Sequence, residues 1–587
     1  MPALILRHRS FFISLIAIFL GGLLAWLVQT SAGSIDVQDI RFQSESGATH
    51  SALLYIPDCV NAQNPAPGVL AVHGYINSRE TQSAYAIEFA RRGYVVLAMD
   101  QRGHGYSDPP AFAEGFGGPA GLSYLRSLDI VDPDQVALAG HSMGGWTVLS
   151  AAVAMPDAYR SVVVSGSSTG TFGVPAGDAE FPRNFGLVFG QYDEFSGTMW
   201  LSETGAGIVD TEKLQTQFGV SERVESARLY GSIEAGTARQ LYQPAQTHPA
   251  NHITQSGVGG ALDWLQMTTA TPNAIPPDQQ IWPWKEFGTF ISLVGAIGVL
   301  LTVGPLLLEL PLFSSLASAP APAAGIRDNS WYLAAVIAMA IPALSYFSFQ
   351  GLAWLPTNAI FAQNLTNGFV IWAVGNGLIS LLLFALWHFV LGGKAKGGDA
   401  QAYGLIAADG FSPARIARQA LLAVGVISIL YLLLAINHAL FTADFRYWVI
   451  AVKLMSGLHF QLFLGYLIPF TLFFIVFGIV LHGQMRRDDG QSLLASASTN
   501  AVLAGGGILV LLLIQYGSLF IRGSLAIPAQ ALLTIVALQF VVVLPIAAII
   551  STRYFRLTGQ VYAGAFVNGL FVTWLIVAGQ ATHYAFG

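Results

Sequence analysis

Residues 136–147 read VALAGHSMGGWT, and this stretch decides the fold of the first half of the chain. A short apolar run typical of a buried strand leads directly into the pattern G-x-S-x-G over 140–144, and a helix is predicted over 143–155. A serine on such a tight strand-to-helix turn is exposed for attack, and the flanking glycines remove the Cβ atoms that would clash there. The helix N-terminus also favours the negative charge that develops nearby. Ser142 is therefore the predicted nucleophile.

The sequence around this turn alternates short β-branched runs with helical stretches, from residue 36 to residue 266. Such alternation is typical of a mostly parallel sheet covered by helices on both faces, so we predict an α/β fold here. Strands are predicted at 48–56, 68–73, 94–99, 136–139, 161–165, 185–189 and 241–243, and helices at 81–92, 143–155 and 258–266.

Two later strand ends offer partners for the serine. Asp193 follows a predicted buried strand, and an aspartate there would orient a histidine and stabilise its charged form; the adjacent Glu194 is the alternative acid. The loop after the last strand reads THPANHIT over 247–254 and offers two candidate bases. We expect His252 to be the base because its distance to the closing helix suits such a loop, with His248 as the alternative.

The order Ser142, Asp193, His252 resembles the α/β-hydrolase superfamily, because a His-Gly pair precedes the serine and DQRGHGYS over 100–107 lies between. The likeness is to its dienelactone-hydrolase-like and esterase/peptidase branches, and it covers about residues 36–268. This resemblance implies acyl transfer through an acyl-serine intermediate, without a metal or another cofactor.

The resemblance also implies an oxyanion hole and a cover for the pocket. The backbone N–H groups of Tyr75 and Met143 would stabilise the oxyanion, and such donors contribute roughly 3–4 kcal/mol to the transition state. A large cap domain is not expected, because only a short stretch separates the strand at 161–165 from the next strand. The insertion 196–235 is the predicted cover over the pocket.

The composition divides the chain into a soluble part and a membrane part. Only 10% of the residues are charged and the mean hydropathy is +0.56, whereas soluble proteins carry about 25% charged residues. The acidic excess is confined to the first part, with 25 acidic and 13 basic residues between Thr30 and Lys285. From Glu286 onward there are 8 acidic and 12 basic residues, and no basic block suggests a nucleic-acid partner.

Apolar runs predict one N-terminal span and about eight more. The run 11–29 is long enough to cross a hydrocarbon core of about 30 Å, as an uncleaved anchor or as a signal peptide. The predicted domains are an anchor (1–33), a catalytic α/β domain (34–268), a linker (269–286) and a helical membrane domain (287–587), the last without a recognised family. Further spans are predicted near 288–308, 331–350, 368–391, 419–440, 462–481, 501–520, 526–550 and 561–583.

Loop charge predicts the orientation in the membrane. Arg7 and Arg9 precede the first span, and placing them inside puts nine Lys and Arg residues on cytoplasmic loops and three on external loops. The α/β domain is then extracytoplasmic, on a plasma membrane such as the bacterial inner membrane.

These patterns favour a serine hydrolase that cleaves an ester, thioester or amide, with a small-molecule or lipid acyl substrate and membrane lipids as neighbours. Two other hypotheses stay open. One is a membrane acyltransferase that uses the same triad. The other is a transporter or receptor whose hydrolase-like domain does not catalyse a reaction.

Overall fold

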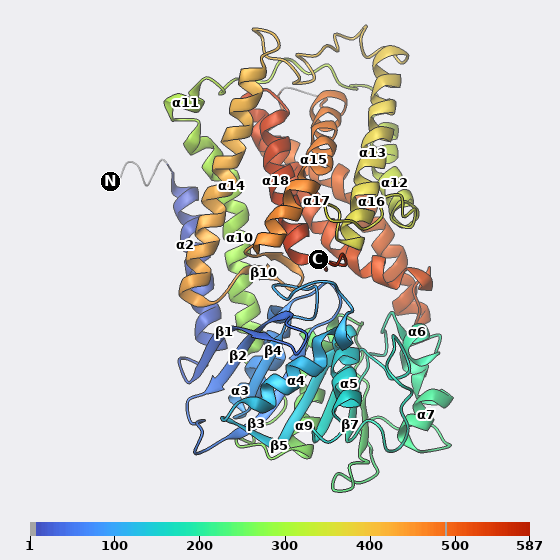
Figure 1. The fold of residues 1–587 in the computed structure, drawn as a ribbon. Coiled ribbons are helices and arrows are strands. Elements are labelled where there is room, and N and C mark those ends of the chain that lie inside the picture. Colours follow the sequence, from blue (N-terminus) through green and yellow to red (C-terminus); the bar gives the residue numbers. More distant parts are fainter. Residues whose placement is uncertain (1–7, 488–489, 587) are drawn as a thin grey trace.

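The computed structural model describes residues 8–487 and 490–586, so Arg7 of the predicted basic flank lies outside the described residues. Figure 1 shows two parts joined end to end: an α/β part built from residues 35–268, and a helical part above it. The C-terminal end of the chain returns to the junction between the two parts (Figure 1). The fold class predicted from the sequence, an α/β fold followed by a helical membrane domain, is confirmed.

A sheet of nine strands, counted among the described residues, forms the centre of the α/β part, in the order β1-β2-β4-β3-β5-β6-β7-β9-β8. The run from β4 to β9 pairs in parallel, whereas β1, β2 and β8 run antiparallel to their neighbours. The strands are β1 (Ile35–Gln43), β2 (Thr49–Pro57), β3 (Ala66–Val72), β4 (Val95–Met99), β5 (Val131–His141), β6 (Ser161–Ser165), β7 (Phe185–Val188), β8 (Leu229–Tyr230) and β9 (Arg239–Tyr242).

Helices cover both faces of this sheet. The helices α3 (Ser83–Arg91) and α9 (Gln255–Thr268) bury apolar side chains against one face, and α4 (Gly118–Ser127) and α5 (Met143–Ala154) against the other. The strands β3 and β4 are fully buried because they are covered on both sides, which explains their continuous apolar sequence. The sequence pattern missed β1 and β8, which lie at the two edges of the sheet, and α4, which contains two glycines.

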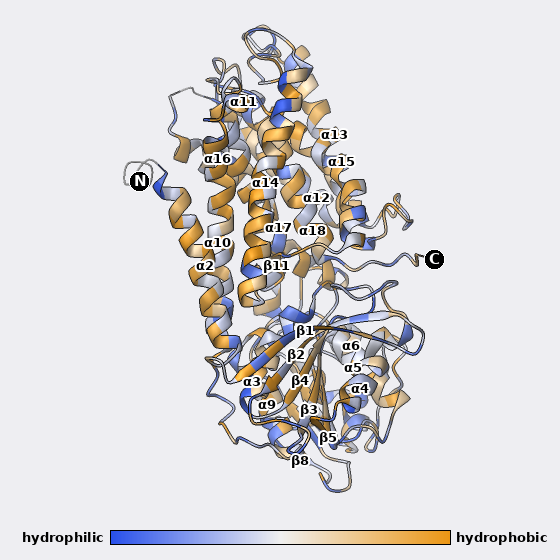
Figure 2. Cartoon of the chain, turned by 60° about the vertical axis from the view of Figure 1, so that its left-hand side comes forward, coloured by the Kyte–Doolittle hydropathy of each residue, from blue (hydrophilic) through white to orange (hydrophobic). Residues whose placement is uncertain are grey.

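Nine helices among the described residues are long and apolar enough to span a membrane, which indicates a multi-pass membrane protein. Figure 2 colours most of their residues as hydrophobic. They are α2 (Arg9–Gln29), α10 (Trp282–Leu307), α12 (Ser330–Gln350), α13 (Asn364–Phe389), α14 (Pro413–Phe441), α15 (Gly457–Ile479), α16 (Leu493–Arg522), α17 (Ala531–Thr558) and α18 (Tyr562–Gly579).

The N-terminal helix α2 packs against α10 through small residues. A Cβ added to Gly21 would lie 2.4 Å from the carbonyl oxygen of Gly288, and the Ser292 hydroxyl donates a hydrogen bond to the carbonyl oxygen of Ile18 at 2.9 Å. Small residues allow this close backbone approach, as in other membrane helix pairs. The first helix is therefore part of the bundle in this structure.

A buried charge cluster joins the α/β part to the hairpin of β10 (Phe445–Tyr447) and β11 (Ile450–Val452) between α14 and α15. The Glu80 carboxylate lies 3.3 Å from the Arg446 guanidinium and 3.4 Å from the Lys453 ammonium. Burial alone would raise the pKa of Glu80, but Lys453, Arg446 and Arg79 hold it well below its ordinary value. Breaking such a buried pair is costly, so the cluster fixes how the two parts dock.

Candidate active site

Ser142 lies on the sharp turn between β5 and α5, with backbone angles of φ 54° and ψ −121°. A positive φ strains a residue that carries a Cβ, and such strain is concentrated at functional sites. Two glycines make the turn possible. A Cβ on Gly140 would lie 2.2 Å from the carbonyl oxygen of Gly144, and a Cβ on Gly144 would lie 2.1 Å from that of Val72. The chain therefore presents the serine at the carboxyl edge of the sheet, where the motif predicts it.

A continuous hydrogen-bonded relay links the serine to a histidine and an aspartate. The Ser142 hydroxyl donates to Nε2 of His248 at 2.9 Å. Nδ1 of the same imidazole donates to the Asp193 carboxylate, whose two oxygens lie 3.0 and 3.1 Å away. The prediction that His252 meets the serine is wrong, and the alternative His248 occupies that place.

The position of His248 depends on a contact that is distant in sequence. A parallel bridge between Tyr192 and Thr247 holds the loop after β9 beside the loop after β7, and so sets His248 next to Asp193. The helix α8 (Ala250–Ile253) starts directly afterwards and carries His252 into the interior. The loop length considered in the sequence contains no information about this bridge, which is why spacing selected the wrong histidine.

His252 supports the relay from behind instead. Its ring packs 3.8 Å from the ring of His141, and Nε2 of His141 donates to the carbonyl oxygen of His248 at 3.1 Å. Burial, followed by the nearby His248, lowers the pKa of His252 to about 3, so this imidazole is neutral at ordinary pH. It is a neutral packing group beneath the relay.

The acid is held by several donors. Besides His248, the Asp193 carboxylate accepts hydrogen bonds from the backbone N–H of Phe195 at 2.9 Å and from the Asn251 amide at 2.8 Å. The sequence prediction did not include Asn251. The one feature that could have indicated its role is its position in the loop that carries the two histidines. The alternative acid Glu194 does not bond to a ring nitrogen of His248; its carboxylate accepts from the backbone N–H of that residue at 2.6 Å instead.

The surroundings of His248 give an expected pH dependence. Burial alone would lower its pKa, but the charge and hydrogen bond of Asp193, together with the charge of Glu194, raise it above the ordinary value of 6.5. A protonated imidazole cannot accept the serine proton, so activity is lost as pH falls through this raised pKa. We expect the acid limb of kcat/KM against pH to have its midpoint above 6.5, measured on a soluble chromogenic ester. A midpoint below 6.5 would contradict the assignment of His248 as the base.

The two expected oxyanion donors lie at the ends of neighbouring strands. Met143 is the first residue of α5, so its N–H has no acceptor within the helix. Tyr75 follows β3, and within the described part of the chain its N–H donates to no backbone or side-chain acceptor. Both groups are thus available to a ligand, as an oxyanion hole requires, and their catalytic role stays a prediction.

The helical part covers the carboxyl edge of the sheet, which carries the relay. The Tyr75 hydroxyl lies 3.0 Å from Nε2 of His583 in the C-terminal tail, and Tyr106 donates to the carbonyl oxygen of Leu454 at 3.0 Å. The tail also pairs with the loop after β4, where the N–H of Thr582 donates to the carbonyl oxygen of Gly103 at 2.7 Å. The insertion 196–235 was the predicted cover, but these contacts show that the helical part lies over the loops of the site.

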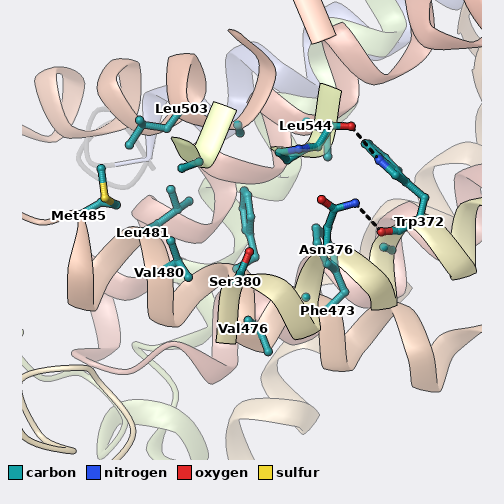
Figure 3. A pocket seen from close by; sticks show the side chains of 16 residues that line it. Trp372, Asn376, Ser380, Phe473, Val476, Val480, Leu481, Met485, Leu503 and Leu544 are labelled. Atoms are coloured by element: carbon teal, nitrogen blue, oxygen red, sulfur yellow. Dashed lines mark hydrogen bonds between the residues drawn. The ribbon is translucent and has the colours of Figure 1, made fainter. Parts of the chain in front are cut away.

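A separate cavity of about 80 Å³ lies within the helical part, among α12, α13, α15, α16 and α17. Its lining is mostly apolar, and Figure 3 shows Asn376 as one of its few polar side chains. The Asn376 amide donates to the carbonyl oxygen of Trp372 at 2.8 Å and to the Ser345 hydroxyl at 3.0 Å, so it bridges helices rather than facing a ligand alone. None of the relay residues lines this cavity.

Comparison with known proteins identifies the fold of the α/β part. Residues 67–203 match the family model described as the alpha/beta hydrolase fold, so this segment is an α/β-hydrolase domain. The match covers the strand, turn and helix around Ser142 and extends past Asp193. The resemblance predicted from the sequence is therefore confirmed for this segment.

Three known proteins are similar to parts of this chain. Dipeptidyl aminopeptidase BIII of Pseudoxanthomonas mexicana is 29% identical over 34% of this chain and 33% of its own length. The mitochondrial palmitoyl-protein thioesterase ABHD10 of Rattus norvegicus is 33% identical over 18% of this chain and 35% of its own. A dienelactone hydrolase-like phosphotriesterase from metagenomic libraries has a TM-score of 0.30, 16% identity, and coverage of 40% of this chain and 98% of its own. The chain spans about a third of the length of these two curated relatives.

Proposed function

We propose that the protein is a membrane-anchored serine hydrolase that cleaves an ester, thioester or amide at the extracytoplasmic face of the membrane. One observation carries this proposal: the relay from the Ser142 hydroxyl through His248 to Asp193, with distances of 2.9 and 3.0 Å. A strained serine between two close-packed glycines, joined to a histidine held by an aspartate, is the arrangement that acyl transfer requires.

The geometry supports the following sequence of steps. Nε2 of His248 accepts the serine proton while Oγ attacks the acyl carbon. The backbone N–H groups of Tyr75 and Met143 donate hydrogen bonds to the carbonyl oxygen and stabilise its negative charge. The bond to the leaving group then breaks, and the imidazolium returns its proton to that group. Water, deprotonated by the same imidazole, releases the acid and restores the serine. Asp193 keeps the imidazole in the tautomer with its proton on Nδ1 throughout.

The surroundings of the site favour an acyl substrate that comes from lipid. Three exposed apolar side chains of the α/β part, Phe112, Phe172 and Leu201, lie on the loops after β4, β6 and β7, on the same edge as the relay. The ring of Phe195 packs 4.6 Å from the His248 ring, which adds an apolar wall beside the base. An apolar wall and rim at the junction with membrane helices suit an acyl chain better than a charged substrate.

A second candidate function differs from hydrolysis in the molecule that accepts the acyl group. If a membrane-resident alcohol or amine replaced water, the same relay would make the protein an acyltransferase. Incubation with a radiolabelled acyl donor in proteoliposomes separates the two functions. Free acid as the only labelled product supports hydrolysis, and a labelled lipid ester or amide supports transfer.

Active-site labelling tests the proposal directly. The full-length protein in detergent is treated with a fluorophosphonate, digested and analysed by mass spectrometry. We expect one phosphonylated serine, Ser142, because only a serine activated by a base reacts quickly with this reagent. No adduct, or adducts spread over other serines, would reject the hydrolase function.

The single cysteine tests the orientation. Cys59 is exposed on the α/β part, and the sequence contains no other cysteine. With the α/β part outside, a membrane-impermeant maleimide should modify Cys59 in intact cells or, for a bacterial host, in spheroplasts. Cys59→Ser provides the unlabelled control. Labelling that appears only after the membrane is opened would place the α/β part in the cytoplasm.

A further inference from the structure

One carboxylate connects the catalytic histidine to a membrane helix. Glu194 follows the acid of the relay and is buried, with 7% of its surface exposed. One of its oxygens accepts the backbone N–H of His248 at 2.6 Å. The other accepts the hydroxyl of Tyr516, a residue of α16, at 3.0 Å.

The packing around this connection is continuous. Tyr516 and Phe195 both pack against a buried apolar cluster that contains Leu519, Leu525 and Ala531 of the helical part. The Phe195 ring also contacts the His248 ring, with centroids 4.6 Å apart. The loop after β7 therefore touches α16 through the hydrogen bond of Glu194 and through apolar contacts of Phe195 and of Tyr192, whose ring lies 5.3 Å from that of Phe520.

We propose that Tyr516 is a positioning residue for the catalytic histidine and acts through Glu194, so that the helical part completes the active site rather than only anchoring it. This inference rests on the serine hydrolase function proposed above. The Tyr516 hydroxyl fixes the rotamer of Glu194, and the Glu194 carboxylate then fixes the backbone of His248. A shift of about 1 Å in a catalytic group can cost about 100-fold in rate, so loss of this support is measurable.

The ionisation of Glu194 adds a second effect. The titratable groups that face it are Asp193 and His248 from the α/β part and Tyr516 from α16. Burial, and then the charge of Asp193, raise the pKa of Glu194 to about 7, while His248 opposes the rise. Removing the Tyr516 hydroxyl takes away a donor that stabilises the carboxylate, so Glu194 becomes protonated at higher pH. The charge that helps to raise the pKa of His248 is then lost.

The experiment compares fluorophosphonate labelling rates of the full-length protein in nanodiscs across a pH series. Tyr516→Phe should label about 10- to 100-fold more slowly, with the acid limb of its pH profile moved to lower pH. Glu194→Gln should move the acid limb in the same direction, because it removes the same negative charge. Tyr106→Phe is the matched control, since it also removes one hydroxyl bond between the two parts, and among the described residues Tyr106 has no hydrogen bond or ring contact with Glu194 or His248.

The outcomes separate this inference from the function on which it rests. If wild-type Ser142 is labelled and Tyr516→Phe matches wild type in rate and in midpoint, the positioning role is refuted and the hydrolase stands. If Tyr516→Phe only lowers the fraction of labelled protein, with an unchanged midpoint, the residue has a merely structural role and the inference also fails. If wild-type Ser142 is not labelled at all, the proposed function itself fails.

Discussion

Ser142→Ala is expected to abolish hydrolysis of acyl esters, with kcat reduced by about 10⁶-fold. The serine supplies the atom that forms the acyl-enzyme, and its loss alone removes nearly all of the catalysis that such a relay provides. The remaining rate would come from the oxyanion donors and from substrate binding. The measurement is the release of 4-nitrophenol from a medium-chain ester by protein purified in detergent, with the variant and wild type at equal concentrations.

The stability of the variant provides the control for this prediction. Alanine keeps the Cβ at a position with φ 54°, so the backbone strain is the same in both proteins and thermal unfolding should be nearly unchanged. Ser142→Gly should be equally inactive but more stable, because glycine adopts positive φ without this strain. Hydrolysis that survives in Ser142→Ala would mean that the α/β part binds or regulates instead, as expected for a transporter or a receptor.

The α/β fold could be predicted because its signals are local. The apolar run before Ser142, the two glycines and the start of a helix at Met143 lie within a few residues of each other, and they fix a strand, a turn and a helix without any distant contact. Asp193 could be predicted for the same reason, since it follows a buried strand directly.

The rest of the site depends on contacts between distant segments. The bridge that places His248 joins residues 192 and 247, and the hydrogen bond from Tyr516 crosses from the helical part to a loop more than 300 residues earlier. The segment that covers the site could not be predicted for the same reason, because it is distant in the sequence. The sequence suggested the nearest long insertion, but the C-terminal tail, which follows the last of the nine apolar helices of the described residues, also lies over the loops of the site. A sequence pattern covers only residues that are close along the chain, so it cannot predict contacts between such distant segments.

The second large effect on kcat is expected at the two histidines of the loop 247–254. His248→Gln is expected to lower kcat by at least about 10⁴-fold, because glutamine cannot accept and return the serine proton. His252→Gln is expected to keep kcat within about 10-fold of wild type, since His252 packs on the ring of His141 and makes no hydrogen bond to Ser142, His248 or Asp193 among the described residues. Both variants make the same chemical change four residues apart, so they control for each other in the same ester assay.

Fluorophosphonate labelling extends this comparison to the serine itself. The reagent reacts with Ser142 only while a base removes its proton, so His248→Gln should lose labelling and His252→Gln should retain it. His252 is 1% exposed and packs on a buried ring, so His252→Gln is also expected to unfold at a lower temperature than wild type. The two positions thus separate catalysis from packing. His248→Gln should be folded and unreactive, whereas His252→Gln should be less stable and reactive. The reverse pattern would show that the histidine loop rearranges in the working enzyme, with His252 moving to the serine.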